Sequence, residues 1–193
     1  MTWVRVFVFP RLRRSKKTVG YTKLLVDLYI VALLGVEIAT LCFWAHPGVA
    51  LWCKAIAAFG LIDVLGATCR DLIVASSLHE DDDGPFILVQ DPIRWLLLMP
   101  LSALQVVICF AILYLSFGAE FEKTPIDNPM MAVYYSLVTF TTLGYGDITP
   151  KSSSAIGQFL VSAELVGFIT FLAVKLPIAV AITRVRGGGG ASS

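Results

Sequence analysis

The chain has 193 residues, of which 57% are hydrophobic and 15% charged, and its formal net charge is +1. Soluble domains carry about 25% charged residues, so this composition predicts an integral membrane protein instead of a soluble enzyme, and the net charge gives no indication of nucleic-acid binding. The cysteines lie in apolar stretches without metal-ligand spacing, so we expect free thiols at Cys42, Cys53, Cys69 and Cys109.

The N-terminal segment 1–23 contains seven basic residues and no acid, and an apolar stretch follows from Leu24 to Trp44. This stretch is too long for the apolar core of a signal peptide, and no small-residue cleavage site follows it. We therefore expect a basic cytoplasmic N-terminus and a retained first membrane helix. The short turn at 45–48 makes the next helix, about 49–78, its antiparallel neighbour, so residues 24–78 are predicted to form a two-helix hairpin.

Charged residues occur within both helices of this hairpin. In a straight antiparallel hairpin, Glu37 and Lys54 lie at nearly the same depth, and Asp27 and Arg70 lie about one helical turn apart. Both are therefore predicted ion pairs. Asp63 is left without an obvious partner in the hairpin, and we expect it to contact another subunit or a water-filled crevice.

The rest of the chain divides by composition into a loop and a pore domain. Residues 79–94 are polar and acidic, which predicts a cytoplasmic loop, and the pore domain 95–182 follows. Within it we expect an outer helix at 95–117 and an inner helix at 155–182, with the segment between them not crossing the membrane. The tail 183–193 is rich in glycine and reads as a linker.

The distribution of basic residues predicts the orientation in the membrane. Ten Lys or Arg outside the spans fall on the side of the N-terminus, whereas the opposite side has only Lys123 and Lys151. Because cytoplasmic loops carry the excess of basic residues, both termini are predicted to be cytoplasmic. The expected location is a cell membrane, either a plasma membrane or a bacterial inner membrane, with the lipid bilayer as surroundings.

A short helix is predicted at 129–140, with Asn128 as its N-cap and Pro129 at the first helical position, where a missing N–H costs nothing. Its length of about 18 Å is too short for a hydrocarbon core of about 30 Å. The chain segment that contains this helix must therefore enter the membrane and return to the same side of it. The negative end of its dipole points towards the membrane centre, where it favours a cation.

The segment 141–147, Thr-Thr-Leu-Gly-Tyr-Gly-Asp, follows this helix. A dehydrated K⁺ ion needs several oxygens at once, and backbone carbonyls can supply them if the chain visits both signs of φ, which Gly144 and Gly146 permit without steric cost. The predicted ion ligands are carbonyls of Thr142, Leu143, Gly144, Tyr145 and Gly146. The competing interpretation is a surface turn that happens to contain Gly-Tyr-Gly-Asp.

This segment resembles the signature loop of the potassium channel family, with Leu143 where the commonest form has Val. The resemblance covers about residues 95–182 and is closest to bacterial channels with a single pore loop. It implies an all-α integral membrane protein with four transmembrane helices, a re-entrant pore helix and filter between helices three and four, and a homotetrameric pore. It also implies passive K⁺ conduction without catalysis, with K⁺ as the bound ion and no organic cofactor.

Several residues are expected to support the filter. By resemblance, the hydroxyls of Tyr134 and Tyr135 are candidates to brace Tyr145 and Asp147 from behind, whereas Val138 stands where some relatives carry an acid. Thr141 begins the segment. Glu164 is an acid within the membrane and needs partners, which we expect to be the hydroxyl of Thr139 or of Thr141.

The inner helix contains the candidates for gating. Gly167 lies where the family often has a hinge glycine, although close packing against a neighbouring helix explains it equally well. Phe168, Phe171 and Lys175 share one helical stripe, which by resemblance faces the cavity. For Lys175 the alternative is a side chain that reaches the cytoplasmic headgroups. Pro177 is expected to bend the helix near an inner gate.

Two other functions remain open at this point. A non-selective cation channel would have the same fold with an altered filter. A four-helix transporter or scaffold would use the charged residues of the first hairpin, namely Glu37, Asp63 and Arg70. No helix carries Arg or Lys at every third position, so strong voltage gating is not expected.

Overall fold

The computed structural model describes residues 16–44, 50–77 and 92–188. Its helices are α2 (Lys16–Cys42), α3 (Ala50–Ser77), α4 (Pro92–Ser116), α5 (Pro129–Phe140) and α6 (Ala155–Gly188). Most of the basic segment 1–23, the predicted turn at 45–48 and almost all of the acidic loop 79–94 lie outside the described residues.

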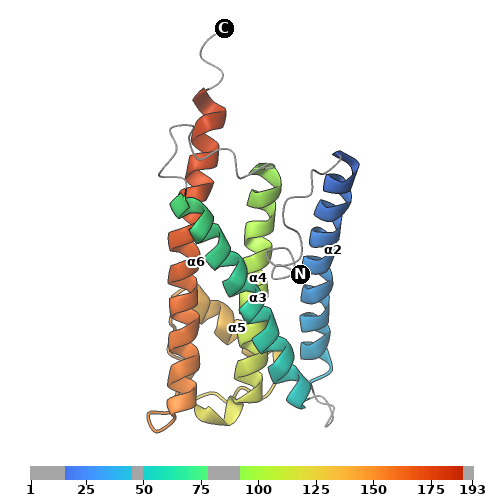
Figure 1. The fold of residues 1–193 in the computed structure, drawn as a ribbon. Helices are drawn as coiled ribbons and strands as arrows, with labels where there is room; N and C mark the ends of the chain where they lie inside the picture. The colour runs from blue at the N-terminus through green and yellow to red at the C-terminus, as the bar shows by residue number, and fades with distance from the viewer. Residues whose placement is uncertain (1–15, 45–49, 78–91, 189–193) are drawn as a thin grey trace.

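The long helices alternate in direction along the chain (Figure 1). α2 begins at the same end of the molecule at which α6 ends, and the connections on either side of α5 gather at the opposite end. α3 does not run straight beside α2. It crosses the molecule obliquely, from the end of α2 towards α6, and packs chiefly against α4.

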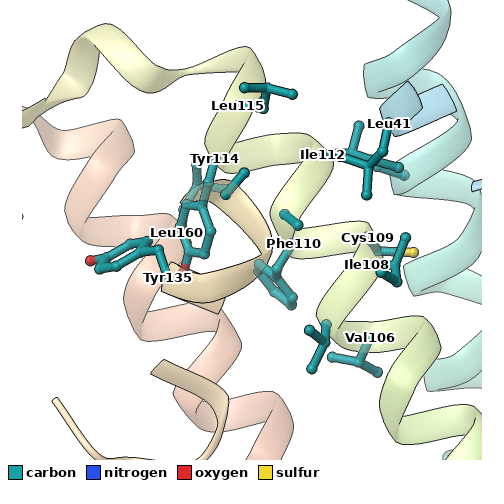
Figure 2. Packing of buried hydrophobic residues seen from close by; sticks show 14 of the residues in the cluster. Leu41, Val106, Ile108, Cys109, Phe110, Ile112, Tyr114, Leu115, Tyr135 and Leu160 are labelled. Carbon is teal, nitrogen blue, oxygen red and sulfur yellow. The ribbon is translucent and has the colours of Figure 1, made fainter. Parts of the chain in front are cut away.

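α4 is the centre of the packing because other helices cover it on two sides. Every residue from Gln105 to Ile112 is buried, without the polar face that a helix half exposed to water would show. Tyr114 lies beside Tyr135 and Leu160, whereas Ile112 and Leu41 meet on the other side of α4 (Figure 2). One helix thus joins the N-terminal pair to the part of the chain around α5.

The chain between α4 and α6 is closed at its base by a small antiparallel ladder. The short helix η2 (Gly118–Glu120) leads into β1 (Phe121–Glu122), which pairs with β2 (Thr149–Pro150). The backbone N–H of Lys151 adds a hydrogen bond of 2.9 Å to the carbonyl of Glu120. These bonds hold together the two ends of the loop that carries α5 and the segment 141–147.

Among the described residues, three helices are long and apolar enough to cross a membrane. Their apolar stretches are Trp52–Cys69 in α3, Leu96–Ser116 in α4 and Ala155–Pro177 in α6, whereas Pro129–Phe140 is a shorter apolar helix. The 27 residues of α2 stay a predicted fourth span. The four cysteines are free thiols.

Candidate functional site

α5 has the bounds predicted from its capping residues. The side chain of Asn128 accepts a hydrogen bond of 2.9 Å from the backbone N–H of Met131, and Pro129 occupies the first turn. At the other end, the Oγ1 of Thr141 donates to the carbonyl of Leu137 at 2.7 Å. Thr141 therefore caps the C-terminal end of α5, directly before the segment from Thr142 to Asp147.

The sign of φ alternates along the segment from Thr142 to Gly146. Thr142, Gly144 and Gly146 have φ values of 58°, 55° and 73°, and the residues between them do not have positive φ. Alternation of this kind turns successive carbonyls towards one side of the strand. The two glycines were expected in this role, but Thr142 was not, and a positive φ costs a residue with a Cβ about 1–2 kcal/mol.

Hydrogen bonds from the end of α5 hold the start of the segment. The N–H of Thr142 donates to the carbonyl of Thr139, and the N–H of Leu143 to that of Val138, each at 3.0 Å. Beyond these bonds the segment is open, since all seven residues are exposed in the single chain. Leu143 and Tyr145 are exposed by 59% and 66%, which is high for apolar or aromatic side chains.

The far end of the segment is held by side chains from α5 and from the loop before it. The hydroxyl of Tyr134 donates to Oδ2 of Asp147 at 2.8 Å, as expected for a bracing tyrosine. The Oγ1 of Thr124 donates to the carbonyl of Asp147 at 3.0 Å, and the Nζ of Lys123 to that of Gly146 at 2.9 Å. Neither loop residue was singled out from the sequence.

Tyr135 does not brace the segment, contrary to the expectation. Its ring is buried and makes edge contacts with Tyr114 at 4.8 Å and with Phe121 at 5.3 Å between ring centroids. Adjacent residues of a helix point about 100° apart. When Tyr134 faces the segment, Tyr135 must therefore face the core around α4 (Figure 2).

Glu164 is fully buried and links three helices. Its Oε1 accepts a hydrogen bond of 2.6 Å from Ser136 of α5, and its Oε2 one of 2.5 Å from Tyr114 of α4. The predicted partners, Thr139 and Thr141, were wrong, although a structural role was right. The hydroxyl of Ser136 also lies 2.9 Å from the carbonyl of Val107.

The stripe on α6 packs against α5 within the chain and does not line an open cavity there. Phe168 and Phe171 place their ring centroids 5.0 Å and 6.4 Å from that of Phe140. Lys175 is exposed by only 7% and is engaged by another residue of the chain. These ring contacts tie α6 to the end of α5, and the cavity-facing role of the stripe, which belongs to an assembled pore, stays a prediction.

Gly167 and Pro177 both lie inside α6, where a glycine or a proline weakens a helix. A Cβ at Gly167 would meet no atom within 4 Å, so close packing within the chain does not explain this glycine. Pro177 lies inside α6, and the helix continues to Gly188 without ending there. The gating roles of both residues stay predictions.

The charges of the first helices are engaged in ways that the hairpin register did not predict. Glu37 is fully buried and accepts hydrogen bonds from Gln105 at 3.3 Å and from Cys109 at 3.4 Å, both on α4. Lys54 instead stands 4.3 Å from the ring centroid of Phe117. The predicted Glu37–Lys54 pair is wrong because α3 leaves α2 obliquely and both charges turn to α4.

Two other residues of the first helices complete this picture. Asp63 is half-buried and is not without a partner in the chain. The side chain of Arg70 lies outside the described residues, and so does the predicted Asp27–Arg70 pair.

Gly60 is the point of closest approach between α3 and this cluster. A Cβ there would collide with Oε1 of Glu37 and would lie 2.7 Å from Sγ of Cys109. We expect Gly60→Ala to lower the free energy of unfolding by about 1–3 kcal/mol, as overpacking does. The matched control is Gly35→Ala on α2, where a Cβ meets nothing within 4 Å, and which should be neutral or stabilising by up to about 1 kcal/mol. Thermal unfolding in detergent compares the two, and equal melting temperatures would contradict the prediction.

Two comparisons with known proteins indicate the class of protein to which this chain is similar. Residues 102–184 match a family model described as "Ion channel". The chain is also similar to "Two-pore potassium channel 4" of Arabidopsis thaliana, with 30% identity over 90 residues, which cover 44% of this chain and 32% of that protein. Both matches point to a channel and not to an enzyme.

The extent of these matches limits what they cover. The chain spans about a third of the length of the curated relative that it matches. The matched family segment begins within α4 and ends within α6, so it contains α5 and the segment 141–147 but neither α2 nor α3. No solved structure matches the chain.

Four residues that were not predicted as site residues lie at the site in the structure, namely Tyr114, Ser136, Lys123 and Thr124. A signal existed for the first two, because a buried acid such as Glu164 must find donors, and these are hydroxyls of the neighbouring helices. No signal existed for the two loop residues. Their contact with the segment spans 23 positions of the chain and depends on the fold.

Proposed function

We propose that four copies of this chain form a K⁺-selective channel. The permeant ion would pass along backbone carbonyls of Thr142, Leu143, Gly144, Tyr145 and Gly146. The observation that carries the proposal is the alternation of φ across this segment, at the C-terminal end of a capped short helix. Such a backbone offers a row of oxygens to a cation that has lost its water.

The need for several copies follows from the exposure of the segment. Non-helical backbone at membrane depth is tolerated only where it is buried in protein or lines a water-filled cavity. In one chain all seven residues of 141–147 are exposed, and one strand of carbonyls supplies a single wall. A closed ring of four copies around an axis would cover the outward side of each strand and leave its carbonyls facing water and ions.

The orientation in the membrane completes the proposal. α2 would act as a fourth span, so that both termini lie on the cytoplasmic side and the ladder of β1 and β2 lies outside. Its start and the end of α6 lie at the same end of the molecule, which is compatible with this topology (Figure 1). The excess of basic residues near the N-terminus supports the assignment of that end to the cytoplasm.

The test is the reversal potential of the purified protein in planar bilayers with both K⁺ and Na⁺ on each side, at unequal concentrations. We expect a reversal close to the K⁺ equilibrium potential, since the carbonyl row is built for a dehydrated K⁺ ion. Chemical cross-linking of the same preparation should end at a tetramer. Equal permeation of K⁺ and Na⁺ would favour a non-selective cation channel and overturn the selectivity.

A further inference from the structure

The loop before α5 places an ammonium group on the segment 141–147. The Nζ of Lys123 donates to the carbonyl of Gly146 at 2.9 Å, and the neighbouring Thr124 donates through Oγ1 to the carbonyl of Asp147 at 3.0 Å. Two consecutive loop residues thus bind two consecutive carbonyls at the end of the segment that lies beside the ladder of β1 and β2.

The backbone at Lys123 has an unfavourable conformation. Its φ is 70°, in the left-handed region that residues with a Cβ rarely adopt. The preceding residues are fixed in β1, which pairs Glu122 with Thr149. Outliers of this kind persist where the surroundings hold them, and they often coincide with functional positions.

The charge of Lys123 makes the contact more than a structural tie. The ammonium group of Lys123 and a K⁺ ion that enters from outside would bind the same carbonyl oxygen, so the two cations compete for it. Among the described residues Lys123 forms no ion pair, and the carboxylate of Asp147 accepts a hydrogen bond from Tyr134 instead. In a ring of four copies, four ammonium groups would surround the mouth.

We propose that Lys123 is a tethered cation that competes with external K⁺ for the Gly146 carbonyl and so limits conductance at low ionic strength. The inference rests on the proposed function, because it assigns a regulator to the outer end of the same carbonyl row. It predicts a direction of effect that a merely structural lysine would not produce. Loss of a structural tie lowers conductance, whereas loss of a competing cation raises it.

The test compares unitary K⁺ conductance of the full chain and three variants in planar bilayers. Lys123→Gln should raise the conductance at least about twofold at about 10 mM KCl, where the Debye length is about 30 Å, and much less at about 1 M, where it is about 3 Å. Lys123→Arg keeps the charge and should behave as the wild type. The matched control is Lys151→Gln, because the Nζ of Lys151 also donates to a backbone carbonyl, but to that of Ala119 and not to the segment.

An unchanged or lowered conductance in Lys123→Gln would overturn the proposal, and so would an equal rise in Lys151→Gln. If the wild type carries no current, calorimetric K⁺ titration of the same proteins decides instead. Tighter K⁺ binding in Lys123→Gln at low ionic strength would support the tethered cation, and equal binding would overturn it. The reversal potential separately tests the proposed function, because a channel that passes Na⁺ equally can still show the Lys123 effect on conductance.

Discussion

Replacement of Gly144 by Ala should lower the permeability of K⁺ relative to Na⁺ at least about tenfold, which is equivalent to about 1.4 kcal/mol per ion. Gly144 has a φ of 55°, and a Cβ there meets no atom within 4 Å. Within one chain the obstacle is therefore conformational and not steric. Left-handed backbone costs an L-residue about 1–2 kcal/mol, so Ala favours a flipped peptide that removes an oxygen from the row. Reversal potentials under asymmetric K⁺ and Na⁺ measure the change.

The control for this prediction is Gly167→Ala on α6. That glycine also has no neighbour within 4 Å of an added Cβ, but it lies in a helix, where Ala is the better residue. Gly167→Ala should leave the reversal potential unchanged. If Gly167 is a hinge, the substitution will change the kinetics with which the channel opens. A Gly144→Ala channel that assembles and keeps its K⁺ selectivity would contradict the role given to the alternating backbone.

Glu164→Ala should prevent the isolation of an assembled protein. The substitution removes the acceptor of two buried donors, the hydroxyls of Tyr114 and Ser136. The Tyr114 hydroxyl is left without an acceptor, which costs about 1–3 kcal/mol, whereas the Ser136 hydroxyl keeps the carbonyl of Val107 at 2.9 Å. The cavity left by the deleted side chain adds to the cost. The total is a large part of a typical stability of about 5–15 kcal/mol. Glu164→Gln keeps the shape and one acceptor oxygen, so it should assemble with a reduced melting temperature.

A double-mutant cycle identifies the contact that is responsible. Tyr114→Phe should destabilise the wild type but cost much less in the Glu164→Gln background if the two groups interact, with a coupling of about 0.5–3 kcal/mol. Size-exclusion chromatography and thermal unfolding in detergent give the required values. Strictly additive effects would mean that the hydrogen bond of 2.5 Å between the two side chains does not depend on the carboxyl group at position 164, since Gln can also accept from Tyr114.

The part of the site that could be predicted from the sequence is local. Asn128 and Pro129 mark the start of α5. The N–H groups of the first turn have no partner within the helix, so Asn128 supplies an acceptor for one of them, and Pro129 has no N–H that would need one. Positive φ at Gly144 and Gly146 follows from the absence of a Cβ. Tyr134 reaches Asp147 across only 13 positions of the chain.

Most of the errors concern contacts between elements that are distant in sequence, whereas the misplacement of Tyr135 is explained by the local spacing of side chains around a helix. Glu37 was paired by depth with Lys54, but the crossing of α3 over α4 gives it Gln105 and Cys109. Glu164 was assigned to threonines near the segment, but the rotation of α6 turns it to Ser136. The sequence shows that a buried acid needs hydrogen-bond donors. Which residues supply these donors depends on the angles at which the helices pack.

By itself, the sequence determined the membrane character of this protein, the bounds of α5 and the residues able to form a row of carbonyls. Composition, capping and the stereochemistry of glycine are properties of single residues and short segments, so they can be read without a fold. The tertiary structure alone decided that Phe168 and Phe171 pack on Phe140 and that Lys123 reaches Gly146. These contacts depend on helix crossing angles and on the ladder of β1 and β2, which arise when the whole chain packs at once.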